Sequence, residues 1–135
     1  MSKITLGTVQ FGIDYGINSE NGQVQPEEVR SILNYAHSQN IDLLDTAPAY
    51  GNSEKVLGVT NVQNFKVVTK TRHFESFEIK NTDVKLLNND FHHSLKDLKQ
   101  HSVYGVLIHD ADDLLKPGAE KLFDKLQELK QAEKI

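Results

Sequence analysis

The sequence contains no cysteine, which excludes disulfide bonds and thiolate metal sites and fits a reducing compartment. It also lacks an apolar run near the roughly 20 residues that span a membrane. Residues 1–4 run into a strand pattern without the apolar core of a signal peptide. Positive charge is not in excess: the formal net charge is −4 at pH 7, which argues against nucleic-acid and membrane partners. These absences predict a soluble, cytoplasmic protein.

The composition fits a single globular domain. The chain has 135 residues, of which 38% are hydrophobic and 25% charged, as expected of one compact unit with its own core. It has no low-complexity linker and no shift in composition that would mark a boundary. We therefore expect one domain over residues 1–135.

Strand and helix patterns alternate along this domain. Four short apolar or β-branched runs predict strands at residues 4–9, 41–44, 65–71 and 103–109. Helical patterns follow them, so the strands should run parallel, with right-handed crossovers, in an α/β fold. Two architectures fit this order: an open doubly wound sheet, or four βα units of a (β/α)8 barrel.

Three longer helices are predicted from apolar residues at helical spacing. Their expected starts lie near Pro26, near Thr82 or Asp83, and near Pro117. A shorter helix, entered at residues 52–53, is expected to end near Gly58, which would act as its C-cap. The residues expected on the buried faces of the longer helices are Val29, Ile32, Leu33, Ala36, Val84, Leu87, Phe91, Leu95, Leu98, Leu122, Phe123, Leu126 and Leu129.

Ionisable residues stand at the carboxyl ends of the predicted strands. Asp45 follows the second strand, Lys70 lies near the end of the third, and His109 ends the fourth. These ends meet at one rim of a barrel, where barrel active sites lie, so their placement favours the barrel over the open sheet. Tyr50 follows Asp45 by five residues on a loop and is expected at the same rim.

Side-chain alternation along the strands predicts which residues face the barrel interior. If Lys70 points inward, Val68 does too, whereas Val67 and Thr69 face the helices. Leu107 takes an inward position in the fourth strand by the same reasoning. A charged residue above an apolar strand interior is more typical of an active site than of a purely structural position.

Structural alternatives stay open for each of these residues. Asp45 could cap a turn or form an ordinary buried ion pair with Lys70, and Tyr50 could be a plain loop aromatic. His109 could be a hydrogen-bonded imidazole in the core. The aspartates that follow it are expected to cap a turn rather than bind a cation, and the other histidines, which lack metal-ligand spacing, are expected at the surface. These residues are Asp110, Asp112 and Asp113, and His37, His73, His92, His93 and His101.

Four segments, in chain order, carry a resemblance to a known family. They are LGTVQFG (6–12), DTAPAYGNSE (45–54), VVTKT (67–71) and VLIH (106–109). The sequence resembles the aldo-keto reductases, whose catalytic tetrad matches Asp45, Tyr50, Lys70 and His109 position by position. The resemblance implies a TIM-type (β/α)8 barrel, of which this chain supplies the first four βα units.

The resemblance also implies a chemistry. Family members reduce an aldehyde or ketone to an alcohol with a nicotinamide cofactor, usually NADPH, with NADH possible here. Tyr50 would be the proton donor, Lys70 would favour its charged form, and Asp45 would hold Lys70 by a charge-assisted hydrogen bond. His109 would orient the small-molecule carbonyl substrate. Gly7 and Thr8 match first-strand positions near the cofactor, and Asp45 is expected beside it as well.

The length of the chain departs from this family. A complete (β/α)8 barrel typically needs about 250 residues, whereas this chain has 135 and ends where a fifth strand would follow. The chain therefore looks truncated, most of the cofactor site would lie beyond residue 135, and activity of the chain alone is in question.

Two other functions fit the same residues. One is a non-catalytic regulatory subunit that senses a nicotinamide nucleotide, and the other is a self-assembling half-barrel with a structural role. Turnover of NADPH with aldehydes would separate the enzyme from both. An open (βα)4 sheet would expose an apolar inner face and two strand edges, so we expect it to pair with a second copy or with the missing barrel half.

Overall fold

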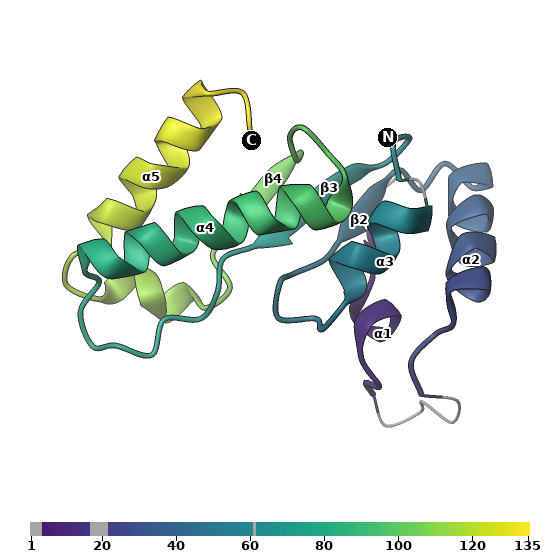
Figure 1. Cartoon of the computed structure of the whole chain (residues 1–135), viewed down its shortest axis with the longest axis horizontal. Coiled ribbons are helices and arrows are strands. Elements are labelled where there is room, and N and C mark those ends of the chain that lie inside the picture. The colour runs from purple at the N-terminus through teal and green to yellow at the C-terminus, as the bar shows by residue number, and fades with distance from the viewer. Residues whose placement is uncertain (1–3, 17–21, 61) are drawn as a thin grey trace.

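The computed structural model describes residues 4–16, 22–60 and 62–135 (Figure 1). Within these ranges, no helix is both long and apolar enough to cross a lipid bilayer. Residues 1–3, which entered the signal-peptide prediction, lie outside them. The elements are β1 (Leu6–Gly7), α1 (Val9–Gly12), α2 (Pro26–Ser38), β2 (Leu43–Asp45), α3 (Ser53–Thr60), β3 (Lys66–Lys70), α4 (Asn81–Leu98), β4 (Gly105–Leu107), the 3₁₀ helix η1 (Ala111–Leu115) and α5 (Glu120–Gln131).

The four strands form one parallel sheet in the order β1-β2-β3-β4. In its register Gly7 lies opposite Asp45, Asp45 opposite Val68, and Lys70 opposite Leu107. A parallel sheet in sequence order, with helices between its strands, confirms the first four βα units of a TIM-type barrel. The open doubly wound alternative is excluded, because its strand order reverses at a switch point.

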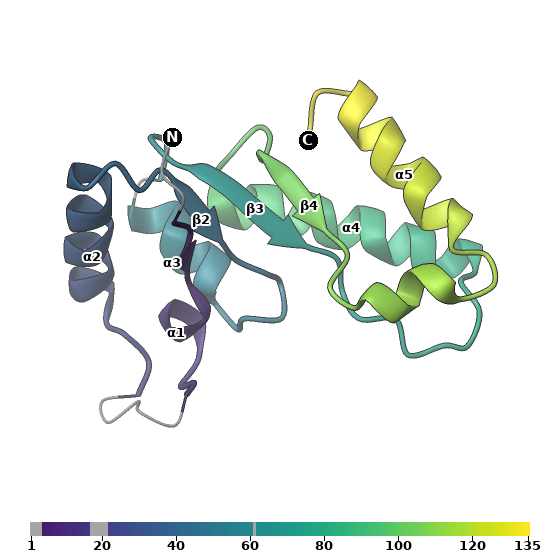
Figure 2. The ribbon, with the colours of Figure 1, turned by 180° about the vertical axis from the view of Figure 1, so that it is seen from behind.

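Among the residues that the structure describes, the helices cover one face of this sheet and leave the other open. Figure 1 shows α4 in front of β3 and β4, and Figure 2, seen from behind, shows the strands in front of α3 and α4. Val67 and Thr69 are buried on the helix side, whereas Leu107 is 52% exposed on the other side. The side-chain alternation predicted for these strands is therefore confirmed.

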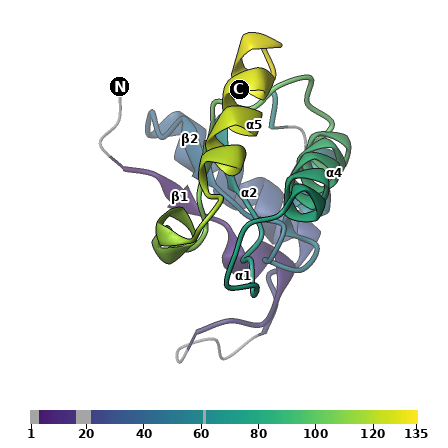
Figure 3. The ribbon, with the colours of Figure 1, turned by 90° about the vertical axis from the view of Figure 1, so that its left-hand side faces the viewer.

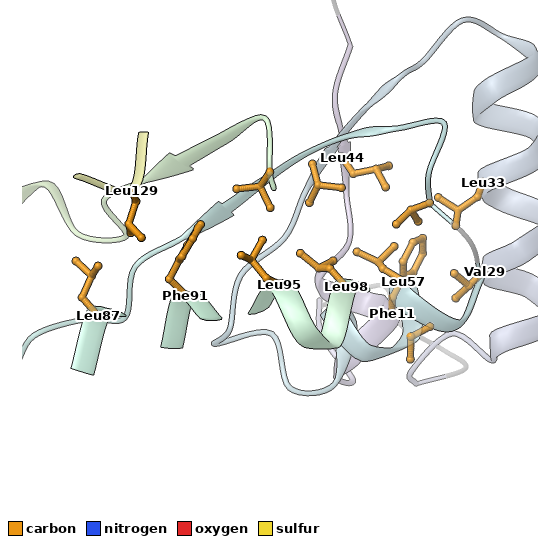
Figure 4. Close-up of a cluster of buried hydrophobic side chains, with 14 of the residues drawn as sticks. Phe11, Val29, Leu33, Leu44, Leu57, Leu87, Phe91, Leu95, Leu98 and Leu129 are labelled. Atoms are coloured by element: carbon orange, nitrogen blue, oxygen red, sulfur yellow. The ribbon is translucent and has the colours of Figure 1, made fainter. Parts of the chain in front are cut away.

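The hydrophobic core lies between the sheet and its helices (Figure 4). The predicted faces of α2 and α4 are confirmed at Leu33 and Leu98, which are both buried. On α5, Leu122 and Leu129 are buried, but Phe123 is 58% exposed, so its prediction as a core residue is wrong. The reason is rotation: Leu129 follows Leu122 by two helical turns and shares its face, whereas the adjacent Phe123 is turned about 100° away.

Gly58 does not act as the predicted C-cap. Helix α3 continues to Thr60, and Gly58 is buried within it. A Cβ at this position would come within 1.9 Å of the Asp97 carbonyl oxygen on α4. The glycine therefore allows the two helices to approach closely rather than ending one of them.

Candidate active site

Three of the predicted site residues come from the carboxyl ends of two adjacent strands. Asp45 is the last residue of β2, and Lys70 is the last residue of β3. Tyr50 lies on the loop of residues 46–52 that joins β2 to α3, which we call the Tyr50 loop. The structure brings all three side chains together, as the sequence predicts.

Lys70 is the centre of this group. Its ammonium donates to Asp45 Oδ1 at 2.7 Å, to the Thr46 carbonyl oxygen at 3.1 Å and to Tyr50 Oη at 3.1 Å. A lysine ammonium has three hydrogens, so each one has an oxygen partner here. The Lys70 side chain is only 14% exposed and that of Asp45 is 31% exposed, which strengthens their charge-assisted bond. The contact with Tyr50 shows that this is more than an isolated ion pair.

Tyr50 accepts from Lys70, which leaves its own hydroxyl hydrogen available. In the described ranges, Tyr50 Oη donates to no protein acceptor. The Lys70 ammonium also lies 4.8 Å from the centre of the Tyr50 ring. The ammonium therefore lies where it can offset negative charge that develops on Tyr50 Oη.

His109 lies beside Tyr50. It lies two residues beyond β4 rather than inside the predicted strand, and its backbone N–H donates to Thr71 Oγ1 at 3.1 Å. Its ring centre is 6.5 Å from that of Tyr50, with the planes inclined by 75°. Because His109 is exposed, it is not the core imidazole of the structural alternative.

Two open hollows adjoin these side chains. One, of about 460 Å³, lies on the inner face of the sheet, and the other, of about 400 Å³, lies at the rim beside Tyr50. The first is lined by Thr5, Gly7, Leu43, Asp45, Val68 and Leu107, and the second by Val9, Ile13, Tyr15, Ala49, Tyr50 and His109.

The rim end of the inner hollow, at Gly7 and Asp45, leaves room for the nicotinamide end of the cofactor that the sequence implies. A Cβ added to Gly7 would meet no atom within 4 Å, so a flat ring can approach the strand there. Thr8 is different, because it is fully buried and its hydroxyl donates to the Asp45 carbonyl oxygen at 2.9 Å. A place for Gly7, Thr8 and Asp45 beside a cofactor stays a prediction.

A second, buried set of polar contacts lies behind the site, and the sequence reasoning missed it. Ser53 and Glu54, which open α3 and which the sequence marks only as the start of a short helix, are both buried. Ser53 Oγ donates to the Thr8 carbonyl oxygen at 2.9 Å, and Thr69 Oγ1 donates to Glu54 Oε1 at 2.6 Å. Burial raises the pKa of the Glu54 carboxyl above its ordinary value.

The sequence contains one indication of these buried polar contacts. Thr69 falls on the helix-facing side of β3, where a buried hydroxyl needs a hydrogen-bond partner. The identity of that partner could not be deduced, because it depends on how α3 lies over the sheet.

The remaining polar predictions concern the loop after β4. Asp110 accepts from the Asp112 N–H at 3.0 Å and so caps η1, as predicted. Asp113 is fully buried instead, and accepts from Lys116 Nζ at 2.6 Å and from the Phe74 N–H at 3.3 Å. The other histidines are exposed, as expected; they are His37, His73, His92, His93 and His101.

Comparisons with known proteins agree with this geometry. A solved structure from Pseudomonas aeruginosa, described as an aldo-keto reductase, aligns over 97% of this chain and 52% of its own, with a TM-score of 0.79 and 28% identity. The holo form of aldo-keto reductase AKR11C1 from Bacillus halodurans aligns over 97% of this chain and 43% of its own, with a TM-score of 0.69 and 18% identity, which shows a shared fold.

The chain spans about half the length of two solved structures from Pseudomonas aeruginosa that it matches. No curated protein gives a significant match. The model of the Aldo/keto reductase family matches residues 3–135, which is nearly the whole sequence. The chain therefore belongs to the aldo/keto reductase family.

Proposed function

We propose that this chain supplies the proton-donating half of an NAD(P)H-dependent reductase that converts an aldehyde or ketone to an alcohol. The observation that carries the proposal is the bonding of Lys70, whose ammonium joins Asp45 Oδ1 at 2.7 Å to Tyr50 Oη at 3.1 Å. This arrangement keeps the Tyr50 proton free for transfer and provides a cation for the phenolate.

The roles of the protein groups follow from these contacts. Tyr50 Oη donates its proton to the carbonyl oxygen as negative charge develops there, a contribution of about 10²–10⁴-fold to the rate. Lys70 stabilises the phenolate that this transfer leaves. Asp45 holds the ammonium in place and compensates its charge within the partly buried site. Water then returns a proton to Tyr50.

His109 and the two hollows account for binding. The His109 ring lies beside Tyr50 at the rim and can orient the carbonyl oxygen towards Tyr50 Oη. Gly7 and Asp45 would hold the nicotinamide end of NADPH, or NADH, against the inner face. When bound, the cofactor supplies the hydride that the carbonyl carbon receives. A second (βα)4 unit would complete the barrel and the rest of the cofactor site.

Oxidation of NADPH with a panel of aldehydes tests this function. The chain is assayed alone and with the carboxyl-terminal half of an aldo-keto reductase barrel, and turnover is expected in the completed barrel. Tyr50→Phe should lower kcat by about 10²–10⁴-fold and leave cofactor affinity nearly unchanged. Tyr104→Phe is the matched control, because this exposed tyrosine lies beside Lys66 at the opposite end of β3.

The outcomes separate the candidate functions. A Tyr50→Phe protein that kept most of its carbonyl-reducing rate would require another acid and would overturn the mechanism. Cofactor binding without turnover in any assembly would support the nucleotide-sensing alternative instead.

A further inference from the structure

The Tyr50 loop leads directly into two buried polar residues. Ser53 and Glu54 open α3 and are 0% and 6% exposed, respectively. Burying polar groups is unfavourable unless they form hydrogen bonds. Their partners therefore show what fixes this end of the helix.

Ser53 connects the start of α3 to β1 and β2. Its hydroxyl donates to the Thr8 carbonyl oxygen at 2.9 Å and lies 3.0 Å from Thr8 Oγ1, which itself donates to the Asp45 carbonyl oxygen at 2.9 Å. Thr46 Oγ1 completes the group at 3.3 Å from Ser53 Oγ. The backbone that carries Asp45 is thus held to the same serine that follows the Tyr50 loop.

Glu54 connects the start of α3 to β3. Its carboxyl accepts from Thr69 Oγ1 at 2.6 Å, and Thr69 directly precedes Lys70. Thr69 is 1% exposed, so this bond is shielded from water. The glutamate therefore ties the end of the Tyr50 loop to the strand that carries the ammonium.

Backbone packing transmits this anchoring to Tyr50. The Ser53 N–H donates to the Tyr50 carbonyl oxygen at 3.1 Å. Gly12 presses on the same peptide, since a Cβ there would come within 1.7 Å of the Tyr50 carbonyl oxygen and 2.5 Å of the Ser53 nitrogen. Little freedom remains between the anchored residues and the Tyr50 backbone.

We propose that Ser53 and Glu54 are positioning residues that keep Tyr50 Oη within hydrogen-bond distance of Lys70 Nζ. They touch neither the proton donor's hydroxyl nor the ammonium, and act through the Tyr50 loop on one side and β3 on the other. The role in catalysis rests on the proposed function, whereas the effect on the Tyr50–Lys70 contact can be measured without turnover.

Nuclear magnetic resonance on the full chain, labelled with carbon-13 at tyrosine Cζ, tests the proposal. The change in the Tyr50 chemical shift caused by Lys70→Met is the signature of the contact. We measure it in the parent and in Glu54→Leu, Thr69→Val, Ser53→Ala and Glu54→Gln backgrounds. Tyr35 and Tyr104, which are exposed and lie outside the two hollows, serve as internal references.

The three disruptive backgrounds should lose more than half of this signature. Glu54→Gln should retain most of it, because the amide oxygen still accepts from Thr69. Glu27→Leu is the matched control: Glu27 is likewise the second residue of a helix but is exposed, and the signature should be unchanged. A merely structural role would lower stability and leave the signature intact in the folded protein.

Each outcome has a definite meaning. Full retention of the signature in folded Thr69→Val and Ser53→Ala overturns the proposal. If Glu54→Leu does not fold, Thr69→Val tests the role of Glu54 in its place. This variant removes the hydrogen bond between Thr69 and Glu54 with little change in side-chain shape. In an active assembly Thr69→Val should lower kcat by up to about 10²-fold with KM unchanged. Loss of the signature, together with absence of reductase activity in the completed barrel as well as in the chain alone, overturns the proposed function and leaves the positioning role standing.

Discussion

Lys70 donates all three hydrogens of its ammonium to oxygen atoms in the candidate site. Another side chain at this position would therefore not reproduce its contacts. An arginine would offer a planar fork in place of three tetrahedral donors and would not reproduce the bonds to Asp45, Thr46 and Tyr50. The loss of the cation would also leave the Asp45 carboxylate without its partner.

Lys70→Met should therefore impair proton transfer. We expect kcat in the completed reductase to fall by about 10²–10⁴-fold, because the phenolate of Tyr50 loses its stabilising cation. Steady-state assays measure this. Lys66→Met is the control: Lys66 lies at the other end of β3, has a 41% exposed side chain and pairs with Asp42 at 3.7 Å. An equal loss of activity in both variants would show that the effect is not specific to the site.

Glu54 should make stability depend on pH. Burial raises the pKa of its carboxyl above 4.5; Asp97 adds to the rise, whereas Thr69, Ser94 and His93 oppose it. The folded chain thus holds this proton more tightly than the unfolded chain. The stabilising contribution is fully present below pH 4.5 and is lost as the pH rises through the higher pKa of the folded state.

Urea unfolding of the parent and of Glu54→Gln, from acid to neutral pH, measures this effect. The free energy of unfolding of the parent should fall relative to that of the variant as the pH rises above 4.5. Glu27→Gln, at the exposed second position of α2, should show no such divergence from the parent. A parent that gained stability relative to Glu54→Gln over this range would contradict the prediction.

Some residues of the site could be predicted from the sequence, and others could not. Asp45 and Lys70 were predictable, because a charged residue at a strand end needs only the strand pattern to be placed. Thr46 contributes through its carbonyl oxygen, which no side-chain type reveals. Ser53 and Glu54 resemble ordinary helix-start residues in the sequence, and only the angle of α3 on the sheet turns them inward.

Helix α3 carries these anchors, and its position depends on close contact with α4. Replacing Gly58 with alanine would favour the helix by about 1 kcal/mol in isolation. The added Cβ, however, would lie 1.9 Å from the Asp97 carbonyl oxygen and 3.0 Å from its carbon, so the helices must separate. Overpacking of this kind costs about 1–3 kcal/mol.

Gly58→Ala should therefore destabilise the chain by up to about 2 kcal/mol in spite of its higher helix propensity. Chemical denaturation gives the value. Val59→Ala, at the neighbouring 53% exposed position, is the control and should change stability by less than about 0.5 kcal/mol. Gly58→Ala at or above parental stability would show that the two helices can move apart without loss.

The order of the elements was predictable from the sequence, but some of their limits were not. The apolar run at 4–9 predicts one strand, yet only Leu6–Gly7 pairs with β2 and the backbone turns into α1 at Val9. That turn lets Gly12 pack against the Tyr50 loop. The apolar pattern of a strand reflects which side chains are buried and not which backbone groups form hydrogen bonds. The contact between Gly12 and the Tyr50 loop therefore has no periodic signal in the sequence.

The described part of the chain leaves one face of the sheet without a covering layer. Leu43 and Val68 are partly exposed, and Leu107 is 52% exposed, around the inner hollow of about 460 Å³. β1 and β4 are the two ends of the sheet, so each has an outer edge available for pairing. The view in Figure 3 shows β1 on the side of the ribbon opposite α4.

These features argue for a partner of the same architecture. Solved relatives are about twice as long as the part this chain matches. A parallel sheet is stable when both of its faces are covered, and a barrel also removes its edges. We propose that a second (βα)4 unit pairs with β1 and β4 and closes over the inner face, and that for the chain in isolation this unit is a second copy.

The isolated chain should consequently sediment as a species larger than 15.2 kDa at micromolar concentration. Leu107→Lys places a charge on the inner face and should dissociate it, because burying an ammonium in an apolar interface is unfavourable. Leu115→Lys is the matched control: this 82% exposed leucine lies on η1, outside the sheet, and its replacement should leave association unchanged. Addition of the carboxyl-terminal half of an aldo-keto reductase barrel should compete with self-association in the parent and not in Leu107→Lys. A parent that sediments as a monomer and melts cooperatively would show that the open face is stable in water, and would remove the case for pairing.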